Sequence, residues 1–554
     1  MAVFVLKANR LAAALFCSCL ALTVACSAEE VSKSTQVSGK TNTNKKVQVV
    51  RSDQKENPET NQIVSETEEA FLTIQPKENP NILSETLPKD KLHELQSANT
   101  FPKVYTEMEG IVTFRGNNLR NAPSYGTVKE NPALLEKQWS FTTGASPEWG
   151  GGAGWTGQPA IIKWDPEVRE MMNLNEEFKS NEDFIEVIYA SLDGKIYFFD
   201  LESGAQSRPP ITINNPIKGS VSIDPRGYPL LYTGQGIPQQ GQIGYRIFSL
   251  IDGKLLHFIP GIDSDAYRHW GAFDGSALVN RDTDTLITGG ENGIFYNIKL
   301  NTVFDKEAKS IKVTPEQIKY RYKVKGNSYQ GIENSVAVYK NLAFFADNGG
   351  SVQGLDLMTM KPIWALPATD DTDASIVIDE EGTTPFLYTG TEVDKLRGSN
   401  SHALIRKING ITGEVVWKKE YAAFYNEHVN GGMLSTPIIG KNEIQDLSIF
   451  TIARHKSMNA GLMVALNKTT GEEAWRWEMP NYTWSSPVAV YDKHGQAFIV
   501  QSDSVGNMYL LDGKSGKIIN KINLGANIEA SPAVYNDSII VASRGGQIFK
   551  VTIK

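Results

Sequence analysis

Acidic and amide side chains precede several short apolar stretches of this chain. Glu333 and Asn334 stand directly before "SVAVY", and Asp371 and Asp373 stand before "ASIVID". Carboxylate and amide oxygens are the ligands that calcium takes, and a carboxylate near a reacting group can act as a base. Asp and Asn also bond their own backbone in turns, so the same residues have a structural interpretation.

Aromatic residues hold the same position ahead of other apolar stretches. Examples are Trp155 in "GWTGQP", Trp270 in "RHWGAF" and Trp484 in "NYTWSSP". Flat aromatic faces beside carboxylates and amides suit a sugar ring or an extended peptide, whereas packing in a core is the alternative. If these positions converge on one axial funnel, the candidate ligand residues are Trp155, His269, Trp270, Glu333, Asn334, Asp371, Asp373, His428, Asn430, Trp484 and Glu529.

Other motifs of catalysis and metal binding are absent. The glycine-rich "WGGGAGW" does not join a strand to a helix, so it fails the test for dinucleotide binding. No G-x-S-x-G turn joins a strand to a helix, so serine hydrolysis is not indicated. His269 and His428 would need further histidines at suitable spacing, and the chain has only seven. We predict no catalytic residue and no metal ligand.

The elements that must position these side chains are short β-strands. Residues 183–205, "DFIEVIYASLDGKIYFFDLESGA", read as strand, tight Asp-Gly turn, strand and second turn. Similar units recur, with no long amphipathic helix between them, which predicts an all-β sandwich or propeller.

A repeat at regular spacing along the chain favours the propeller over the sandwich. The innermost strands of eight units begin near Gln158, Gly219, Gly275, Asn334, Ala374, Ser435, Ser485 and Ala530. Seven blades would remain if one early unit were misassigned. The last unit ends at Lys554 without a fourth strand, and "LLEKQWSFTTG" (134–144) with Trp139 is predicted to supply it, which leaves no open sheet edge. The prediction is an eight-bladed propeller of four-stranded blades, closed by an N-terminal strand.

Two segments interrupt this pattern. Residues 110–128, with Arg115 and Arg120, precede the closing strand and are predicted to dock over one face of the propeller. Residues 300–329 form a basic excursion from the repeat, for which a solvated surface hairpin is the expectation and contact with an acidic polymer or partner the alternative.

The N-terminus predicts export. Lys7 and Arg10 lead into a short apolar stretch, and residues 1–25 have the pattern of a signal peptide. "TVAC" resembles a bacterial lipobox, so Cys26 is the predicted lipidation site, with ordinary secretory cleavage as the alternative. Residues 26–99 are polar and poor in aromatics, and we expect a lipid-anchored flexible linker. The propeller then occupies residues 100–554.

The amino-acid composition narrows the classes of protein to which this chain can belong. The cysteines are Cys17, Cys19 and Cys26, so the exported domain has no cysteine pair and must depend on a large core. The net charge of −8 is modest and spread out, which argues against a nucleic-acid partner.

Three phrases carry a resemblance to a known family. "VALNKTTGEEAW" (464–475), "LIRKINGITGEVVW" (404–417) and "YLLDGKSGKII" (509–519) resemble the tryptophan-docking repeat of pyrroloquinoline-quinone-type propellers. The resemblance implies that Trp364, Trp417 and Trp475 pack between neighbouring sheets. It covers two kinds of protein: dehydrogenases with quinone and calcium on the axis, and non-enzymatic relatives that include the lipoprotein assisting outer-membrane protein assembly.

The sequence-based hypothesis is an extracytoplasmic propeller attached by lipid to the cell membrane or outer membrane. It would bind or scaffold an envelope protein or a glycan without catalysis, and without a cofactor. The alternative is a dehydrogenase of alcohols or sugars that depends on pyrroloquinoline quinone and calcium. Many such enzymes carry a disulfide between adjacent cysteines over the quinone, and that form is excluded here because the mature chain lacks the pair.

Overall fold

A computed structural model describes residues 71–74, 82–88, 99–154, 157–394, 401–425 and 430–554. All of them belong to one compact unit, Glu68–Lys554. The predicted signal peptide, Cys26, Trp155 and His428 lie outside the described residues. Within the described part of the chain, no helix combines the length and hydropathy needed to cross a bilayer.

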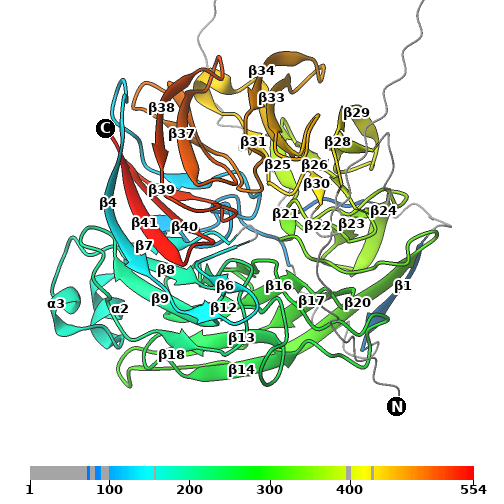
Figure 1. Cartoon of the computed structure of the whole chain (residues 1–554). Coiled ribbons are helices and arrows are strands. Elements are labelled where there is room, and N and C mark those ends of the chain that lie inside the picture. The colour runs from blue at the N-terminus through cyan, green and yellow to red at the C-terminus, as the bar shows by residue number, and fades with distance from the viewer. Residues whose placement is uncertain (1–70, 75–81, 89–98, 155–156, 395–400, 426–429) are drawn as a thin grey trace, which may run out of the picture. The chain divides into compact units, whose positions relative to one another are not determined.

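Eight antiparallel sheets follow one another around a ring, which confirms the eight-bladed propeller (Figure 1). The strands of each blade are given from the innermost outwards. Blade 1 contains β7 (Ala160–Ile162), β8 (Glu186–Ala190), β9 (Lys195–Asp200) and β10 (Ile211–Thr212), and blade 2 contains β11 (Ser222–Ile223), β12 (Leu230–Thr233), β13 (Gly244–Ser249) and β14 (Leu255–Pro260). Blade 3 contains β15 (Leu278–Asn280), β16 (Thr285–Gly289), β17 (Ile294–Lys299) and β20 (Glu316–Val324), and blade 4 contains β21 (Ala337–Tyr339), β22 (Leu342–Ala346), β23 (Val352–Asp356) and β24 (Lys361–Ala365).

Blade 5 contains β25 (Val377–Glu381), β26 (Thr384–Gly390), β28 (His402–Asn409) and β29 (Val415–Ala422), and blade 6 contains β31 (Ile438–Ile439), β32 (Leu447–Ala453), β33 (Gly461–Asn467) and β34 (Glu473–Met479). Blade 7 contains β35 (Val488–Tyr491), β36 (Ala497–Ser502), β37 (Asn507–Asp512) and β38 (Ile518–Asn523), and blade 8 contains β39 (Ala533–Tyr535), β40 (Ser538–Ser543), β41 (Gln547–Ile553) and β4 (Leu135–Thr142). Short elements outside the blades are β2 (Gly110–Ile111), β3 (Ser124–Tyr125), β5 (Ala145–Ser146), β6 (Gly150–Gly151), β18 (Val303–Asp305), β19 (Ser310–Lys312), β27 (Glu392–Val393), β30 (Gly431–Gly432), α2 (Pro166–Met171), α3 (Glu176–Lys179) and the 3-10 turn η1 (Asn442–Ile444).

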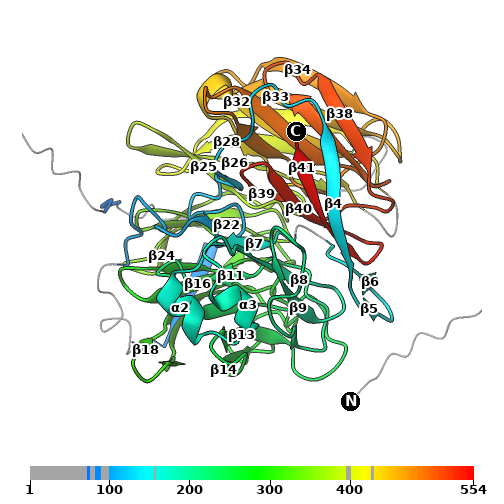
Figure 2. The same cartoon turned by 90° about the vertical axis from the view of Figure 1, so that its left-hand side faces the viewer.

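The N-terminal strand closes the ring as predicted. β4 pairs antiparallel with β41, from Leu135 opposite Ile553 to Thr142 opposite Gln547. Figures 1 and 2 show β4, in cyan, beside the red C-terminal strand. The segment that leads into blade 1 and the C-terminal strand are therefore held together by main-chain hydrogen bonds within blade 8, and β41 is not left as an open edge.

Small hydroxyl residues join consecutive blades where the innermost strands begin. The amide of Ser335 donates to the Oγ of Ser375 at 2.9 Å, and the amide of Ser375 donates to Thr436 Oγ1 at 3.3 Å. The same link runs from Ser276 to Ser335, from Thr436 to Ser486, from Ser486 to Ser531 and from Gln158 to Ser220. Small residues recur there because the strands crowd toward the axis and each hydroxyl satisfies a buried amide of the neighbouring blade.

The predicted docking tryptophans lie between blades. The indole N–H of Trp364 in blade 4 donates to the carbonyl of Gly410 in blade 5 at 2.7 Å, and Trp417 makes the equivalent bond to Lys468 in blade 6 at 2.9 Å. Trp139 of the closing strand reaches Leu201 of blade 1 at 3.1 Å, so the same contact crosses the closure. Each ring lies against a turn glycine, where an added Cβ would come within 3 Å of the indole. The packing role predicted for these tryptophans is confirmed.

Replacing Gly471 by Ala is expected to destabilise the protein more than the same change at Gly382. Both glycines have a positive φ, +69° and +66°, so the backbone strain of about 1–2 kcal/mol is shared. A Cβ at position 471 would meet Trp417 at 2.9 Å, whereas position 382 faces open space. We expect an additional loss of about 1–3 kcal/mol for Gly471→Ala, measured by denaturant unfolding. Equal losses would show that the indole contact adds nothing.

Residues Gly110–Val128, called the plug segment below, fill the axis of the ring. Their backbone pairs with blade 1 through β2 and β7 and with blade 8 through β3 and β39. The carbonyls of Val112, Asn118 and Leu119 accept the amides of Ile223, Val338 and Ile378 in blades 2, 4 and 5. The predicted docking role of this segment is confirmed, and it extends through the centre of the propeller.

Arg115 and Arg120 give the plug segment its contacts to the other blades. Arg115 donates to the carbonyls of Pro437 and Pro487, in blades 6 and 7, at 2.7 Å each. Arg120 donates to the carbonyls of Ser276 and Val336, in blades 3 and 4, at 2.7 and 2.8 Å. Burial lowers the pKa of Arg115 to about 9 and that of Arg120 to about 10, so both remain charged at neutral pH. Between them, backbone and arginines reach all eight blades.

Two sequence-based expectations need correction. The segment 300–329 does contain a hairpin, β18 with β19, but it continues into β20, which is the fourth strand of blade 3. The basic residues hid this strand because only one of its faces is buried. In addition, β1 (Ile82–Leu87) lies within the segment predicted as linker and pairs with β20 along its whole length. Its polar side chains are tolerated because an edge strand is bound through its backbone, with Arg321 reaching Glu85 at 2.6 Å.

Candidate functional site

Buried carboxylates gather on the face of the ring where the innermost strands begin, here called the start face. Asp274 and Glu333 come from the loops that enter blades 3 and 4, and Glu291 comes from the turn between β16 and β17. One oxygen of each lies within 4.8 Å of the others. The ammonium of Lys218 stands among them, 2.5 Å from Asp274 and 3.1 Å from Glu333.

A second group of acids continues this cluster toward blade 5. Asp371 and Asp373 lie in the loop that enters blade 5, and Glu392 forms β27 after β26. The carboxyl groups of Asp373 and Glu392 share a hydrogen bond, and Asn430 donates to Oε2 of Glu392 at 2.7 Å. Glu333 interacts electrostatically with both acids, so the two groups form one unit. We call Asp274, Glu291, Glu333, Asp371, Asp373 and Glu392 the axial acid cluster.

Burial governs the protonation of this cluster. Loss of hydration and the neighbouring Asp371 raise the pKa of Asp373 and of Glu392 well above the ordinary range. Burial also raises the pKa of Glu291, together with Glu333 and Asp274, and brings that of Asp274 to about 6 despite the ion pair with Lys218. At Glu333 the burial effect is outweighed by Lys218, and its pKa lies below the usual value.

The free energy of unfolding is expected to fall as pH rises from about 5 to about 8. In the unfolded chain these carboxyls titrate near pH 4, whereas in the native protein Asp274, Glu291, Asp373 and Glu392 hold protons to higher pH. The native state therefore binds more protons over this interval, and deprotonation favours unfolding. Burial also raises the pKa of Asp347, outside the cluster, to about 7, which adds to the trend. Glu333 and the buried His257, whose pKa values are lowered, oppose it.

Glu392→Gln is the variant that tests this origin, because it removes one raised carboxyl from the cluster. Thermal melts across this pH range should show a smaller slope for Glu392→Gln than for the wild type. Glu182→Gln, which removes one carboxyl at an exposed loop position, is the control and should keep the slope. If Glu392→Gln leaves the slope unchanged, the pH dependence of stability arises elsewhere in the protein.

The structure brings together only part of the candidate set. Glu333, Asp371, Asp373 and Asn430 meet in or beside the axial acid cluster. Trp484 packs in a small apolar cluster with Leu434 and Ala453, and is 8% exposed.

Three further candidate ligand residues are not part of the axial acid cluster. Glu529 lies beside Asn527 and Arg544 at the entrance to blade 8. His269 and Trp270 are exposed on the same face, Trp270 to 38%.

Sequence reasoning missed Lys218, Asp274, Glu291 and Glu392. Lys218 and Asp274 lie in loops that enter blades, which is the signal that identified the other candidates, so a search for charges of both signs would have included them. Glu291 and Glu392 follow the second strand of their blades instead. Their position on the same face becomes evident only when the direction of each strand is known.

Comparisons with known proteins agree with this architecture. Residues 459–554 match the family model described as outer membrane protein assembly factor BamB. The quinohemoprotein alcohol dehydrogenase of Pseudomonas putida HK5 superimposes with a TM-score of 0.51 at 10% identity, covering 84% of this chain and 82% of that one. The fold is that of a pyrroloquinoline-quinone-type repeat propeller. This bears out the resemblance found in the three repeat phrases.

Two further solved structures are similar at lower scores. BamB from Moraxella catarrhalis gives a TM-score of 0.47 at 16% identity, over 76% of this chain and 100% of that one. The quinohemoprotein alcohol dehydrogenase from Comamonas testosteroni gives 0.48 at 12% identity, over 80% of each chain. No curated protein matches the chain.

The repeat propeller does not present Glu333 and Asn334 as a calcium-binding pair. The amide nitrogen of Asn334 donates to the carbonyls of Ala346 and Thr372, both at 2.9 Å, so this side chain joins blades 4 and 5. Glu333 accepts from Lys218 and, at 2.9 Å, from Asn348. The ammonium of Lys218 thus holds the place where a cation would meet Asp274 and Glu333. These residues do not fit a quinone–calcium site.

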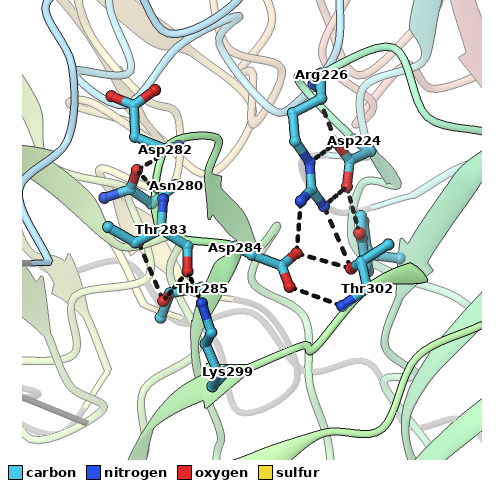
Figure 3. A network of polar contacts seen from close by, with 10 residues as sticks. Asp224, Arg226, Asn280, Asp282, Thr283, Asp284, Thr285, Lys299 and Thr302 are labelled. Atoms are coloured by element: carbon cyan, nitrogen blue, oxygen red, sulfur yellow. Dashed lines mark hydrogen bonds and ion pairs between the residues drawn. The ribbon is translucent and has the colours of Figure 1, made fainter. Parts of the chain in front are cut away.

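Two hollows lie on the opposite face, where the innermost strands end. One of about 560 Å³ is bordered by Arg226 and Tyr228, and the other, of about 670 Å³, lies between the plug segment and Tyr339. Figure 3 shows that Arg226 is bound by Asp224 and, at 2.6 Å, by Asp284. This network ties blade 2 to blade 3 and uses the charge of the arginine structurally. The axial acid cluster is therefore the better candidate site.

Proposed function

We propose that this protein is an extracytoplasmic, lipid-anchored propeller that binds or scaffolds another protein of the cell envelope without catalysis. The observation that carries the non-catalytic part is the pairing of Lys218 with Asp274 and Glu333, at 2.5 and 3.1 Å, in the place of a catalytic cation. The match of residues 459–554 to an outer membrane assembly factor supports the envelope setting. The predicted lipidation of Cys26 would hold the propeller at a membrane.

The rigidity of the ring suits a scaffold. The plug segment and the closing strand fix the blades to one another, so the strands from which the loops arise hold fixed relative positions. Large repeat surfaces of this kind bind partners through several loops at once. A partner would therefore meet a preformed surface and would lose little free energy to ordering it.

The deciding experiment is a titration of the purified protein with pyrroloquinoline quinone and CaCl2, followed by thermal melting and a dye-linked oxidation assay with alcohols and sugars. The proposal expects no saturable shift in Tm and no oxidation. In parallel, a photo-reactive amino acid at Tyr329 on the start face or at Val303 on the opposite face should cross-link one defined envelope protein in intact cells. Tyr329 and Val303 are 51% and 63% exposed, so both labels reach solvent.

Saturable quinone binding with substrate oxidation would overturn the proposal in favour of a dehydrogenase. Glycan binding is the other outcome to separate. Trp270→Ala is the variant to use on a glycan array, because Trp270 is exposed whereas Trp484 is buried and its loss would disturb packing. A glycan signal that Trp270→Ala abolishes would make the partner a sugar and not a protein.

A further inference from the structure

The outer edge of blade 3 differs from the outer edges of the other blades. In blades 2 and 4 to 8 the fourth strand pairs with the third through a register shift, and in blade 1 the fourth strand, β10, has only two residues. Bulges and short strands keep a sheet edge from pairing with a further strand. β20 has nine residues, and its register with β17 is unbroken. The edge of blade 3 therefore lacks the features that protect the others.

A strand already occupies this edge. β1 pairs antiparallel with β20 from Ile82 opposite Val324 to Leu87 opposite Lys319, and Figure 1 shows it, in blue, beside β20. β1 comes from a part of the chain outside the repeat, and blade 3 has its four strands without it. Within the described ranges, no other blade carries a strand beyond its fourth. The edge of blade 3 thus binds an added strand in the native protein.

β1 is held mainly through its backbone. None of its six side chains is buried, and Leu83 is 74% exposed. Ile82 packs in part against the core, the hydroxyl of Thr86 donates to the carbonyl of Met360 at 2.9 Å, and Arg321 donates to Glu85 at 2.6 Å. Segments with few buried apolar contacts open at free energies well below that of global unfolding. β1 is therefore expected to leave the edge while the blades stay folded.

The side chains on the two faces of β20 determine what the edge accepts. On one face the rings of Tyr320 and Tyr322 are buried, and β1 places only small hydroxyl side chains opposite them. On the other face Arg321 stands opposite Glu85, and the residues two positions before and after Arg321 are lysines. Opposite charges on directly facing residues stabilise a strand pair. A strand suited to this edge therefore alternates small residues on the tyrosine face with an acidic residue on the basic face.

We propose that an extended segment of the partner protein pairs antiparallel with β20 in place of β1, with an acidic residue opposite Arg321. This inference rests on the proposed binding function and names the surface and the kind of partner. Backbone pairing would supply the affinity, and the alternating side chains would supply the specificity. Until the partner arrives, β1 covers an edge that would otherwise pair with other chains. Because β1 belongs to the same chain, it competes at a high effective concentration.

The test uses a blocked fluorescent peptide with the sequence of Ile82–Leu87, titrated into three forms of the full chain and followed by anisotropy. The first form is the wild type. In the locked form, Leu83→Cys and Lys323→Cys, which are opposite in the register, are joined by a disulfide, and the only natural cysteine from residue 26 onward is Cys26. In the open form, Leu83→Pro and Ser84→Pro remove two successive N–H groups, one of which faces β20.

We expect the open form to bind the peptide at least about tenfold more tightly than the wild type, because no strand of the same chain competes for the edge. The oxidised locked form should not bind, and reduction with dithiothreitol should restore binding. A matched peptide with Glu85→Lys should bind the open form more weakly. Arg321→Glu in the open form should then reverse the preference between the two peptides.

Three results would overturn the inference: no binding by an open form that thermal melting shows to be folded, equal binding by the oxidised and reduced locked form, and equal binding of the two peptides. If the open form does not fold, the oxidised and reduced locked form decide alone. An envelope protein that cross-links from Tyr329 or Val303 equally in the wild type and the locked form would dock elsewhere, so that this inference fails and the proposed function stands. If the quinone assay is positive, the proposed function fails independently of the peptide result.

Discussion

A chain that begins at Gly144 is expected not to fold into a stable propeller. This truncation removes β4, which supplies the outermost strand of blade 8, and the whole plug segment. Blade 8 would expose an unpaired edge along β41, and the innermost strands would lose their hydrogen bonds on the axis. Domains are stable by only about 5–15 kcal/mol, and the loss of these contacts exceeds that margin.

The matched control is a chain that begins at Phe71, which keeps every contact of the described unit. Circular dichroism and thermal melting should show a cooperative transition for this chain and none, or one at far lower temperature, for the chain from Gly144. A peptide spanning residues 110–144, added to the shorter chain during refolding, should restore the transition, because it carries both missing pieces. A shorter chain that melts like the control would show that the ring closes without them.

Arg120→Met is expected to lower the free energy of unfolding by about 3–6 kcal/mol, which is a large effect for one residue. Arg120 is fully buried and donates to the carbonyls of Phe114, Ser276 and Val336 and to Thr113 Oγ1, at 2.7–2.9 Å. Methionine fills similar space but donates nothing, so three carbonyls lose a partner where water has little access. Each such loss costs about 1–3 kcal/mol.

Two further variants separate this effect from the loss of a charge. Arg120→Lys keeps the charge but not the planar fork, so it should recover only part of the stability. Arg281→Met removes an arginine whose partner Glu107 is 81% exposed, and it should cost less than about 1 kcal/mol. The free energy of unfolding of all three variants is measured by denaturant unfolding. A loss for Arg120→Met as small as that for Arg281→Met would contradict the central role of the plug segment.

The repeat made most of the fold predictable. Each predicted unit begins within a few residues of an innermost strand, and the closing strand around Trp139 follows from the missing strand of the last blade. Glycine turns and docking tryptophans are local signals, since each involves a few residues at fixed spacing. β20 and β1 were missed because one is half-buried and basic and the other is a polar edge strand, so neither has the alternation of its neighbours.

The candidate site was predictable only in part. The sequence placed Glu333, Asp371 and Asp373 in loops that turn toward one face, and the structure brings them together. It also placed Asn334 there, but adjacent residues point in different directions, and this side chain joins two blades instead. Spacing along the chain does not show which of two neighbouring side chains faces the axis.

The sequence by itself determined the propeller architecture, the closure of the ring and the tryptophans that join one blade to the next, because these depend on short repeated phrases, whereas the structure decided for eight blades over seven. Only the tertiary structure decided which charges meet on the axis. Lys218 and Glu333 are separated by 115 residues and come into contact because a closed ring directs every entering loop to the same centre. Which acids share a proton at that centre, and which of them meet Lys218, is a property of the ring as a whole.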